Sequence, residues 1–293
     1  MNRFGEILVK GLSWGMGILF LTGISCIMVY LFSKGLGAVN LRMIFGNTPP
    51  LDAVFHGKAV FGGLFPAIAG TCLLVVFSVS LAIPLGISTG IWLAEYAGKR
   101  MKSLFSLLFD ILAGIPSIVI GLFGFSLAIF LHRHFSQRIY PCLLISACSL
   151  AFLVIPYIIR TTETALEQIP HSIRITAPAM GATKLQNIFY VLVPHSLTGI
   201  LSGIILAIGR CAEDTAVIML TGVVATAGIP KSLLSNYEAL PFYIYYISSQ
   251  YADQQELLNG YGASVILILL CTGLFFMAYI IQKGLAYQAL YRA

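Results

Sequence analysis

The chain has 293 residues, of which 58% are hydrophobic and only 10% are charged, and its formal net charge is +6. Soluble globular domains carry about 25% charged residues, so this composition excludes a soluble fold unless lipid covers much of the surface. The positive charge comes without a basic stripe or an RNA-binding signature, and we therefore expect no nucleic acid as a partner. The sequence predicts a polytopic membrane protein.

Six apolar stretches are long enough to cross a bilayer as helices of about 20 residues. They lie at residues 12–33, 62–94, 104–131, 139–159, 195–227 and 262–282. The fold class that we expect is all-α: a polytopic membrane helix bundle with six transmembrane helices. The first stretch exceeds the roughly 7–15 apolar residues of a cleaved signal peptide, so we expect it to be a retained signal anchor.

The positions of Lys and Arg between these stretches predict the orientation of the chain. If the N-terminus is cytoplasmic, more of these residues lie on the cytoplasmic side than on the outer side. By the positive-inside rule we expect a multi-pass protein with both termini in the cytoplasm. A basic loop at residues 132–138, which includes Arg133 and Arg138, falls on the outer side against this rule.

Two pairs of glycines four residues apart predict close contacts between helices. Gly86 and Gly90 lie in the second stretch, and Gly199 and Gly203 lie in the fifth. Small residues at this spacing let the backbones of two membrane helices approach each other, although ordinary bundle packing would use the same residues.

The loop at residues 160–194 has helical patterns instead of a disordered composition. Residues 161–168 predict a short helix, and residues 183–193 predict an amphipathic helix that follows a break at Gly181. The apolar stripe of this second helix consists of Leu185, Ile188, Phe189 and Leu192. We expect both helices to lie along the cytoplasmic membrane surface, where they either dock a partner or rest on lipid.

Three charged residues, Arg210, Glu213 and Asp214, lie inside the apolar stretch 200–224, with Thr215 beside them. A charge in hydrocarbon costs about 2.5–3.5 kcal/mol on insertion scales, so such residues normally face the bundle interior and pair. The spacings i,i+3 and i,i+4 allow Arg210 to pair with either acid. The group is either a structural ion pair or a place where Arg210 meets a tetrahedral oxyanion. From the spacing alone, we hypothesise that Glu213 orients Arg210 while Asp214 turns toward a second subunit.

The third apolar stretch contains a pattern typical of a broken helix. Gly114, Pro116 and Ser117 follow one another closely within it. Carbonyls freed by such a break, together with the Ser117 hydroxyl, could face a polar cavity. The alternative is a plain proline kink.

Three motifs resemble those of the phosphate-specific permeases of ABC importers. Residues 114–123 (GIPSIVIGLF) resemble the pattern G-[IV]-P-S-I-V-x-G-L-F of that family. Residues 209–216 (GRCAEDTA) are similar to G-R-A-x-G-E-T-A, with Asp214 at the position of the family's acid and Glu213 at a usual glycine. Residues 240–245 (LPFYIY) resemble the L-P-x-x-I-Y pattern of the PstA branch.

A fourth motif lies in the cytoplasmic loop, where Ala177, Gly181 and Pro194 match the spacing of the E-A-A…G…I-x-L-P pattern of ABC-importer permeases. The resemblance implies that this loop is a coupling helix that inserts into an ATP-binding subunit. The implied ATPase-coupling residues are Ala177, Gly181, Ala182, Thr183 and Lys184.

The resemblance also ranks Asp214 above Glu213, which reverses the guess from spacing. The spacing argument and the resemblance together give a substrate path. Its expected residues are Arg210, Asp214, Glu213, Thr215 and Ser117.

The resemblance implies a permease subunit of an ATP-driven phosphate importer in the inner membrane of a prokaryote. Residues 1–60 would form the signal-anchor helix and an outer loop, residues 61–283 the permease domain, and residues 284–293 a short cytoplasmic tail. The implied partners are a second homologous permease, two ATP-binding subunits, an extracytoplasmic phosphate-binding protein and membrane lipid.

The sequence lacks the motifs of ATP hydrolysis and of metal chemistry. There is no G-x-x-x-x-G-K-[ST] loop, so ATP hydrolysis is expected in a separate subunit, and no H-E-x-x-H or C-x-x-C motif occurs. We expect no enzyme activity, no catalytic residue, no cofactor and no metal site. Two alternatives stay open: a permease for another oxyanion (molybdate, tungstate or sulfate), and a non-transporting membrane partner in phosphate sensing.

Overall fold

The computed structural model of the chain describes residues 3–46, 48–50, 63–135 and 140–291, and helices dominate these ranges. The β pairing within them is a single isolated bridge between Val223 and Tyr237. The predicted all-α fold class is therefore confirmed. Part of the expected outer loop of residues 1–60, and Arg138 of the basic loop, lie outside the described residues.

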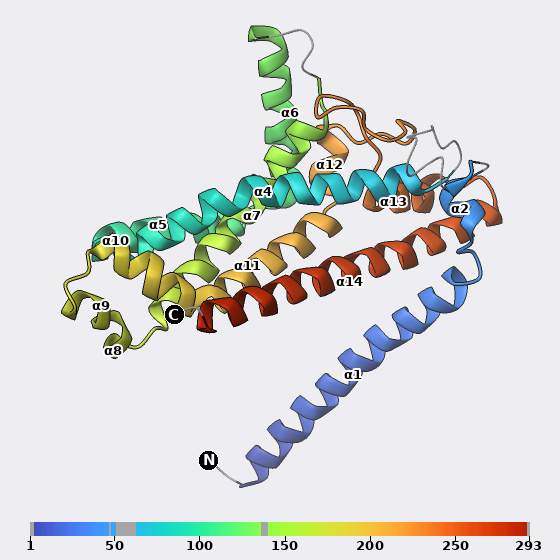
Figure 1. The fold of residues 1–293 in the computed structure, drawn as a ribbon. Helices are drawn as coiled ribbons and strands as arrows, with labels where there is room; N and C mark the ends of the chain where they lie inside the picture. Colours follow the sequence, from blue (N-terminus) through green and yellow to red (C-terminus); the bar gives the residue numbers. More distant parts are fainter. Residues whose placement is uncertain (1–2, 47, 51–62, 136–139, 292–293) are drawn as a thin grey trace.

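The elements follow one another along the chain as helices of very different lengths (Figure 1). They are α1 (Arg3–Gly35), α2 (Leu41–Phe45), α4 (Phe65–Glu95), α5 (Lys99–Ala113), α6 (Ser117–His134), α7 (Leu143–Glu167), α8 (His171–Arg174), α9 (Thr176–Ala179), α10 (Lys184–Asn187), the π-helix η1 (Ile188–Leu192), α11 (Val193–Glu213), α12 (Ala216–Thr221), α13 (Leu240–Gln250) and α14 (Gln254–Tyr291).

Six segments of the described chain are helical, long and apolar enough to cross a membrane, which confirms the predicted number. They are Glu6–Gly35, Phe65–Glu95, Ser117–His134, Leu143–Glu167, Lys184–Glu213 and Gln254–Leu285. The predicted boundaries are wrong for the third and the fifth.

The predicted span at 104–131 is two helices. The amphipathic α5 ends where the N–H of Gly114 donates to the carbonyls of Asp110 (3.1 Å) and Ile111 (3.0 Å). Pro116 then lies directly before α6. A proline cannot continue a helix, and it favours extended backbone at the preceding residue, so α5 and α6 are separate helices. The broken helix expected at Gly114, Pro116 and Ser117 is thus present. Helix α6 packs against α7, where Gly124 meets Ser149, and its far end projects beyond the bundle (Figure 1).

The fifth span begins earlier than predicted, at Lys184, and ends earlier, at Glu213. The helix expected at 183–193 is present as α10 and η1, which continue into α11 without a gap in the chain. Ile188 and Leu192 of the predicted stripe are buried in the core, whereas Leu185 and Phe189 are exposed. Residues 161–168 likewise belong largely to the end of α7.

The continuous helix contains a π-turn directly before Pro194. Proline has no N–H to donate to the carbonyl one turn earlier, and π-turns accommodate such a missing bond. The helix changes direction here: residues 184–192 lie across the ends of α4 and α7, and α11 then runs along α7 (Figure 1).

Helix α7 lies at the centre of the bundle, and both predicted glycine pairs pack against it. An ideal Cβ at Gly86 would lie 2.7 Å from Cβ of Ile158, and one at Gly90 would lie 2.9 Å from the carbonyl oxygen of Ile159. On the other side of α7, Gly199 meets Ala165 and Gly203 meets Thr161. The glycines thus set how closely α4 and α11 approach α7, as their spacing predicts.

Helix α1 packs on the rest of the chain through its last turns. Gly35 lies against the backbone of Tyr261 in α14, and the rings of Tyr30 and Tyr261 meet edge to face. The remainder of α1 diverges from the bundle (Figure 1), and none of the apolar residues of its membrane-spanning part is buried within this chain.

The loops gather at two opposite ends of the bundle. At one end, the N–H groups of Leu143 and Leu144 donate to the carbonyls of Ser235 (3.1 Å) and Leu233 (2.8 Å), which fixes the 222–239 loop on the start of α7. At the other end lie α8, α9 and α10, and the end of α14 lies near them (Figure 1).

We predict that Gly90→Val lowers the stability of the protein, because the added methyl groups meet the backbone and Thr162 of α7. Overpacking of this kind costs about 1–3 kcal/mol, and the midpoint of thermal unfolding in detergent measures it. Gly273→Val in α14 is the matched control, since no described atom lies within 4 Å of an ideal Cβ there. Equal shifts for the two variants would contradict the packing assigned to α7.

Candidate functional site

The charged group predicted in the fifth span lies where α11 ends. Arg210 Nη1 is 3.0 Å from Glu213 Oε1, and Arg210 Nη2 is 3.5 Å from Asp214 Oδ2. The predicted pairing with both acids is thus present. The side chains of Arg210, Glu213 and Asp214 are 34%, 63% and 3% exposed, respectively, so the two acids have very different environments.

Asp214 holds two elements together. Its Oδ1 accepts a hydrogen bond from the N–H of Val217 (2.9 Å), which caps the start of α12, while its Oδ2 faces Arg210. The hypothesis that Asp214 turns toward a second subunit is wrong, because both oxygens are engaged inside this chain and the residue is buried. Glu213 is the acid on the exposed side, and it contacts Arg210 as the spacing argument expected.

The guanidinium of Arg210 keeps the capacity to bind a further group. Its Nη1 donates one hydrogen bond to Glu213, and its Nη2 forms an ion pair with Asp214, whereas a guanidinium has five N–H donors. About one third of the side chain is exposed in the isolated chain. Arg210 therefore has N–H donors left that an oxyanion could accept.

The two hydroxyl residues predicted for the path lie near this junction. Thr215 is half-buried between α11 and α12, and its carbonyl accepts the N–H of Met219 (3.0 Å). Ser117 is the first residue of α6; one turn later, an ideal Cβ at Gly121 would lie 3.0 Å from the carbonyl oxygen of Ala216. The start of α6 thus approaches the start of α12.

The predicted ATPase-coupling residues lie on or beside the loop of residues 168–183, hereafter the coupling loop. Gly181 has a φ of +87°, and the N–H of Ala182 donates to the carbonyl of Ala177 (3.0 Å), which closes the turn after α9. Thr183 forms a capping box with Gln186 at the start of α10. Met180, at the tip of the loop, is almost fully exposed. The loop therefore presents a structured and accessible surface.

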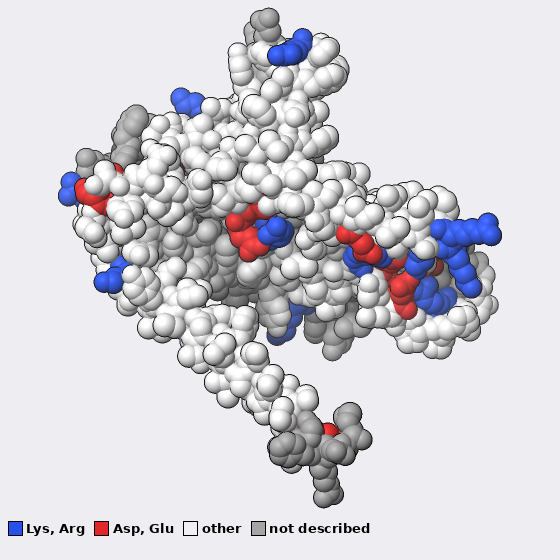
Figure 2. All heavy atoms as spheres, turned by 180° about the vertical axis from the view of Figure 1, so that it is seen from behind, with Lys and Arg blue, Asp and Glu red and all other residues white. Residues whose placement is uncertain are grey.

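Sequence reasoning missed a group of ion pairs that joins α5 to α7. Arg160 Nε donates to Asp110 Oδ1 (3.0 Å), and its Nη1 donates to Glu163 Oε2 (3.0 Å). Lys102 of α5 lies 3.5 Å from the nearly buried Glu163. Figure 2 shows charged side chains gathered at this end of the molecule, where α5 and α8 to α10 lie. The partners across the two helices, such as Arg160 and Asp110, are 50 or more residues apart in sequence, so no local pattern reveals them.

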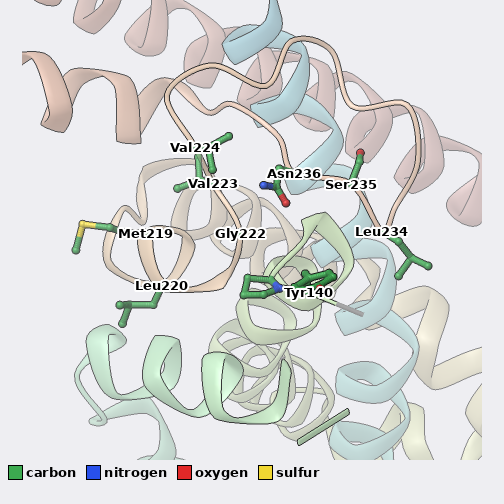
Figure 3. Close-up of a pocket in the computed structure, with 10 residues that line it drawn as sticks. Tyr140, Met219, Leu220, Gly222, Val223, Val224, Leu234, Ser235 and Asn236 are labelled. Carbon is green, nitrogen blue, oxygen red and sulfur yellow. The ribbon is translucent and has the colours of Figure 1, made fainter. Parts of the chain in front are cut away.

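A pocket of about 510 Å³ lies at the opposite end of the molecule, beside the 222–239 loop (Figure 3). Its lining is mostly apolar and consists of Tyr140, Pro141, Met219, Leu220, Gly222, Val223, Val224, Leu234, Ser235 and Asn236. The neighbouring Tyr237 is fully buried, and burial raises the pKa of its hydroxyl. The Arg210 group is not part of this lining, so the pocket is no candidate for the anion site.

Within the ranges that the structure describes, no group of three or more His, Cys, Asp or Glu side chains could hold a metal ion. The six cysteines are free and most lie in or beside the packed spans.

Comparison with known proteins identifies clear relatives. Residues 86–287 match the sequence profile of a family described as the binding-protein-dependent transport system inner membrane component. The phosphate transport system permease protein PstA of Yersinia pestis is 35% identical over 263 residues, which cover 89% of this chain and 81% of the relative. The protein of the same name from Haemophilus influenzae is 31% identical over 270 residues, which cover 92% of this chain and 91% of the relative.

The fold also matches solved structures. One is the crystal structure of a bacterial ABC transporter involved in the import of the acidic polysaccharide alginate. Its TM-score is 0.63 at 15% sequence identity, and the match covers 97% of this chain and 99% of that chain. At this identity the similarity concerns the arrangement of the helices.

We predict that Asp214→Ala destabilises the protein more than Glu213→Ala does. Loss of the cap on α12 costs about 0.5–2 kcal/mol, and Arg210 also loses its buried partner. The exposed pair with Glu213 contributes at most about 1 kcal/mol. Thermal unfolding of both variants in the same detergent measures the difference, and an equal or reversed order would contradict the roles assigned to the two acids.

Proposed function

Because the chain belongs to the family of binding-protein-dependent transport system inner membrane components, we propose that it is the permease subunit of an ATP-driven phosphate importer. Permeases of this family work with a partner permease, an ATPase and a binding protein. The chain is a multi-pass membrane protein and a transport subunit, not an enzyme. The choice of phosphate is supported by the PstA relatives, which match over most of their length.

The observation that carries the proposal is the partly exposed guanidinium of Arg210 at the end of the fifth span. An intramembrane arginine is costly and normally faces a partner or a solute path. The fork of N–H donors suits the geometry of a tetrahedral phosphate oxygen pair. We assign Arg210 the transient binding of phosphate, with Glu213 and Asp214 orienting it and with Thr215 and Ser117 beside the path.

One continuous helical segment links this site to the coupling loop. It runs from Lys184 to Glu213 without a gap in the helical chain, and it bends near Pro194. A displacement of the coupling surface by the ATPase would therefore move the helix that carries Arg210. In this mechanism, closure of the ATPase pair changes the relative position of the two permeases and exposes Arg210 alternately to the two sides.

We further propose the orientation and the assembly that the sequence implies. The coupling loop and both termini face the cytoplasm, with two ATP-binding subunits docked on Ala177 and residues 181–184. The 222–239 loop faces the extracytoplasmic binding protein. A second homologous permease and membrane lipid cover the exposed helices, and residues 61–283 act as the permease domain, preceded by the signal-anchor helix.

Arg210→Gln is expected to abolish phosphate uptake while the complex still assembles, because glutamine keeps a polar side chain but removes the charge and the fork of N–H donors. The measurement is uptake of radiolabelled phosphate by proteoliposomes that contain the complete complex, with co-purification of the ATPase as the assembly check. Arg210→Lys, which keeps the charge without the fork, should retain part of the activity.

Uptake by Arg210→Gln at the unmodified rate would refute the role of this residue. Unmodified complexes that import sulfate, molybdate or tungstate in preference to phosphate would favour the other-oxyanion alternative. Complexes that import none of these anions would favour the sensing partner.

Gly181→Val is expected to weaken binding of the ATP-binding subunit. A left-handed conformation costs a residue with a side chain about 1–2 kcal/mol, so the turn of the coupling loop would relax to another shape. Gly228→Val is the matched control, since Gly228 also has a positive φ (+74°) and no described neighbour within 4 Å, but it lies in the 222–239 loop at the opposite end. The affinity of the ATPase for the detergent-solubilised permeases measures the effect, and equal losses for both variants would exclude a specific role of Gly181.

A further inference from the structure

A single arginine fastens the coupling loop to the bundle. Arg174, the last residue of α8, has only 23% of its side chain exposed. Its Nη1 lies 2.5 Å from Glu95 Oε1 at the end of α4. Its Nε donates to the carbonyl of Ile169 (3.3 Å), and its Nη2 donates to the carbonyl of Leu166 at the end of α7. One side chain thus connects α8 with the ends of two membrane-spanning helices.

The main chain of Arg174 and of Glu95 is held as well. The side-chain amide of Asn187 in α10 donates to the carbonyl of Arg174 (3.0 Å). Lys184 Nζ donates to the carbonyl of Glu95, and it lies 4.2 Å from the centre of the Tyr96 ring. These contacts connect α4, α8 and α10 with one another. We call Arg174, Glu95, Lys184 and Asn187 the Arg174 clamp.

The clamp has little access to water. The Glu95 side chain is 10% exposed, and the guanidinium faces it with a charge-assisted hydrogen bond. Arg174 also supplies positive charge at the carboxyl end of α7, where unpaired carbonyls favour a cation. Removing Arg174 would therefore leave the nearly buried carboxylate of Glu95 without its charged partner, which is costly.

An apolar cluster packs beneath the clamp. Leu166 and Ile169 at the end of α7 are buried together with Ile188 and Leu192 of η1, and Ile91 of α4 packs against them. The end of α4, the end of α7 and the start of the fifth span thus share one packed core. Within the coupling loop, Ile173 reaches this cluster beside Arg174, whereas Met180 at the tip points away as an exposed side chain.

We propose that Arg174 is a positioning residue that makes the coupling loop move as one body with the cytoplasmic ends of α4, α7 and α10. A force applied to the exposed tip of the loop is then transmitted through the clamp to three helices, one of which continues to Arg210. Without the clamp, the coupling loop would move by itself, and its displacement would not reach α4, α7 and α10. This inference rests on the proposed function, because it takes the ATPase to be the partner that moves the loop.

The test compares Arg174→Gln with the unmodified protein in the complete complex in proteoliposomes. The clamp predicts that the ATPase still co-purifies and hydrolyses ATP, while the phosphate transported per ATP falls about tenfold, within the range that substitutions along a coupling path produce. Glu95→Gln should give the same loss. The double variant should be no worse than either single one, because both substitutions break the same interaction.

Two further variants separate positioning from misfolding. Arg174→Lys keeps the charge beside Glu95 but cannot reach both carbonyls, so it should fold and give an intermediate ratio. Arg100→Gln, an exposed arginine at the start of α5, is the matched control and should leave the ratio unchanged.

Hydrogen exchange of residues 168–183 in the assembled complex gives a second readout that does not depend on transport. The clamp predicts faster exchange in Arg174→Gln than in the unmodified complex. Unchanged exchange together with an unchanged ratio would overturn the inference. Failure of the unmodified complex to import phosphate would count against the proposed function. In that case the hydrogen-exchange data would still show whether Arg174 holds the coupling loop in place.

Discussion

The close approach of two helices to α7 is the constraint on which the rest of the structure depends. In lipid there is no hydrophobic force to press helices together, so their packing relies on contact between surfaces of matching shape. Gly86 and Gly90 bring α4 against one side of α7, and Gly199 and Gly203 bring α11 against the other. These contacts place the end of α4 beside the coupling loop and the end of α11 beside α12. Both the clamp and the Arg210 group follow from that arrangement.

Much of this arrangement is local in the sequence and could be predicted from it. The apolar stretches gave six spans, the glycine spacing marked the faces that meet α7, and the i,i+3 and i,i+4 spacings placed both acids beside Arg210. Motifs of the loop marked Gly181 as a turn, and the structure gives it a positive φ. Each of these features is fixed by residues within one or two helical turns of one another.

The errors arose where hydropathy does not distinguish between alternatives. Residues on both sides of Pro116 are apolar, so the stretch 104–131 looked like one span although α5 and α6 are separate. The stripe of residues 183–193 is helical as predicted, but hydropathy did not show that Ile188 and Leu192 are buried while Leu185 and Phe189 are exposed. The pair Arg174–Glu95 joins residues 79 positions apart, and only the folded bundle brings them together.

The two oxygens of Asp214 have a consequence for how long a bound anion stays. One oxygen faces Arg210 and the other caps α12, so the protein already provides this arginine with a resident negative charge. An arriving anion has to compete with that carboxylate for the same guanidinium. If Arg210 turned toward a bound anion, the buried carboxylate of Asp214 would lose its charged partner. That loss is unfavourable, so it would favour the return of Arg210 to Asp214. If Arg210 binds phosphate as proposed, the carboxylate of Asp214 would therefore shorten the time for which the anion stays bound, without contacting the anion itself.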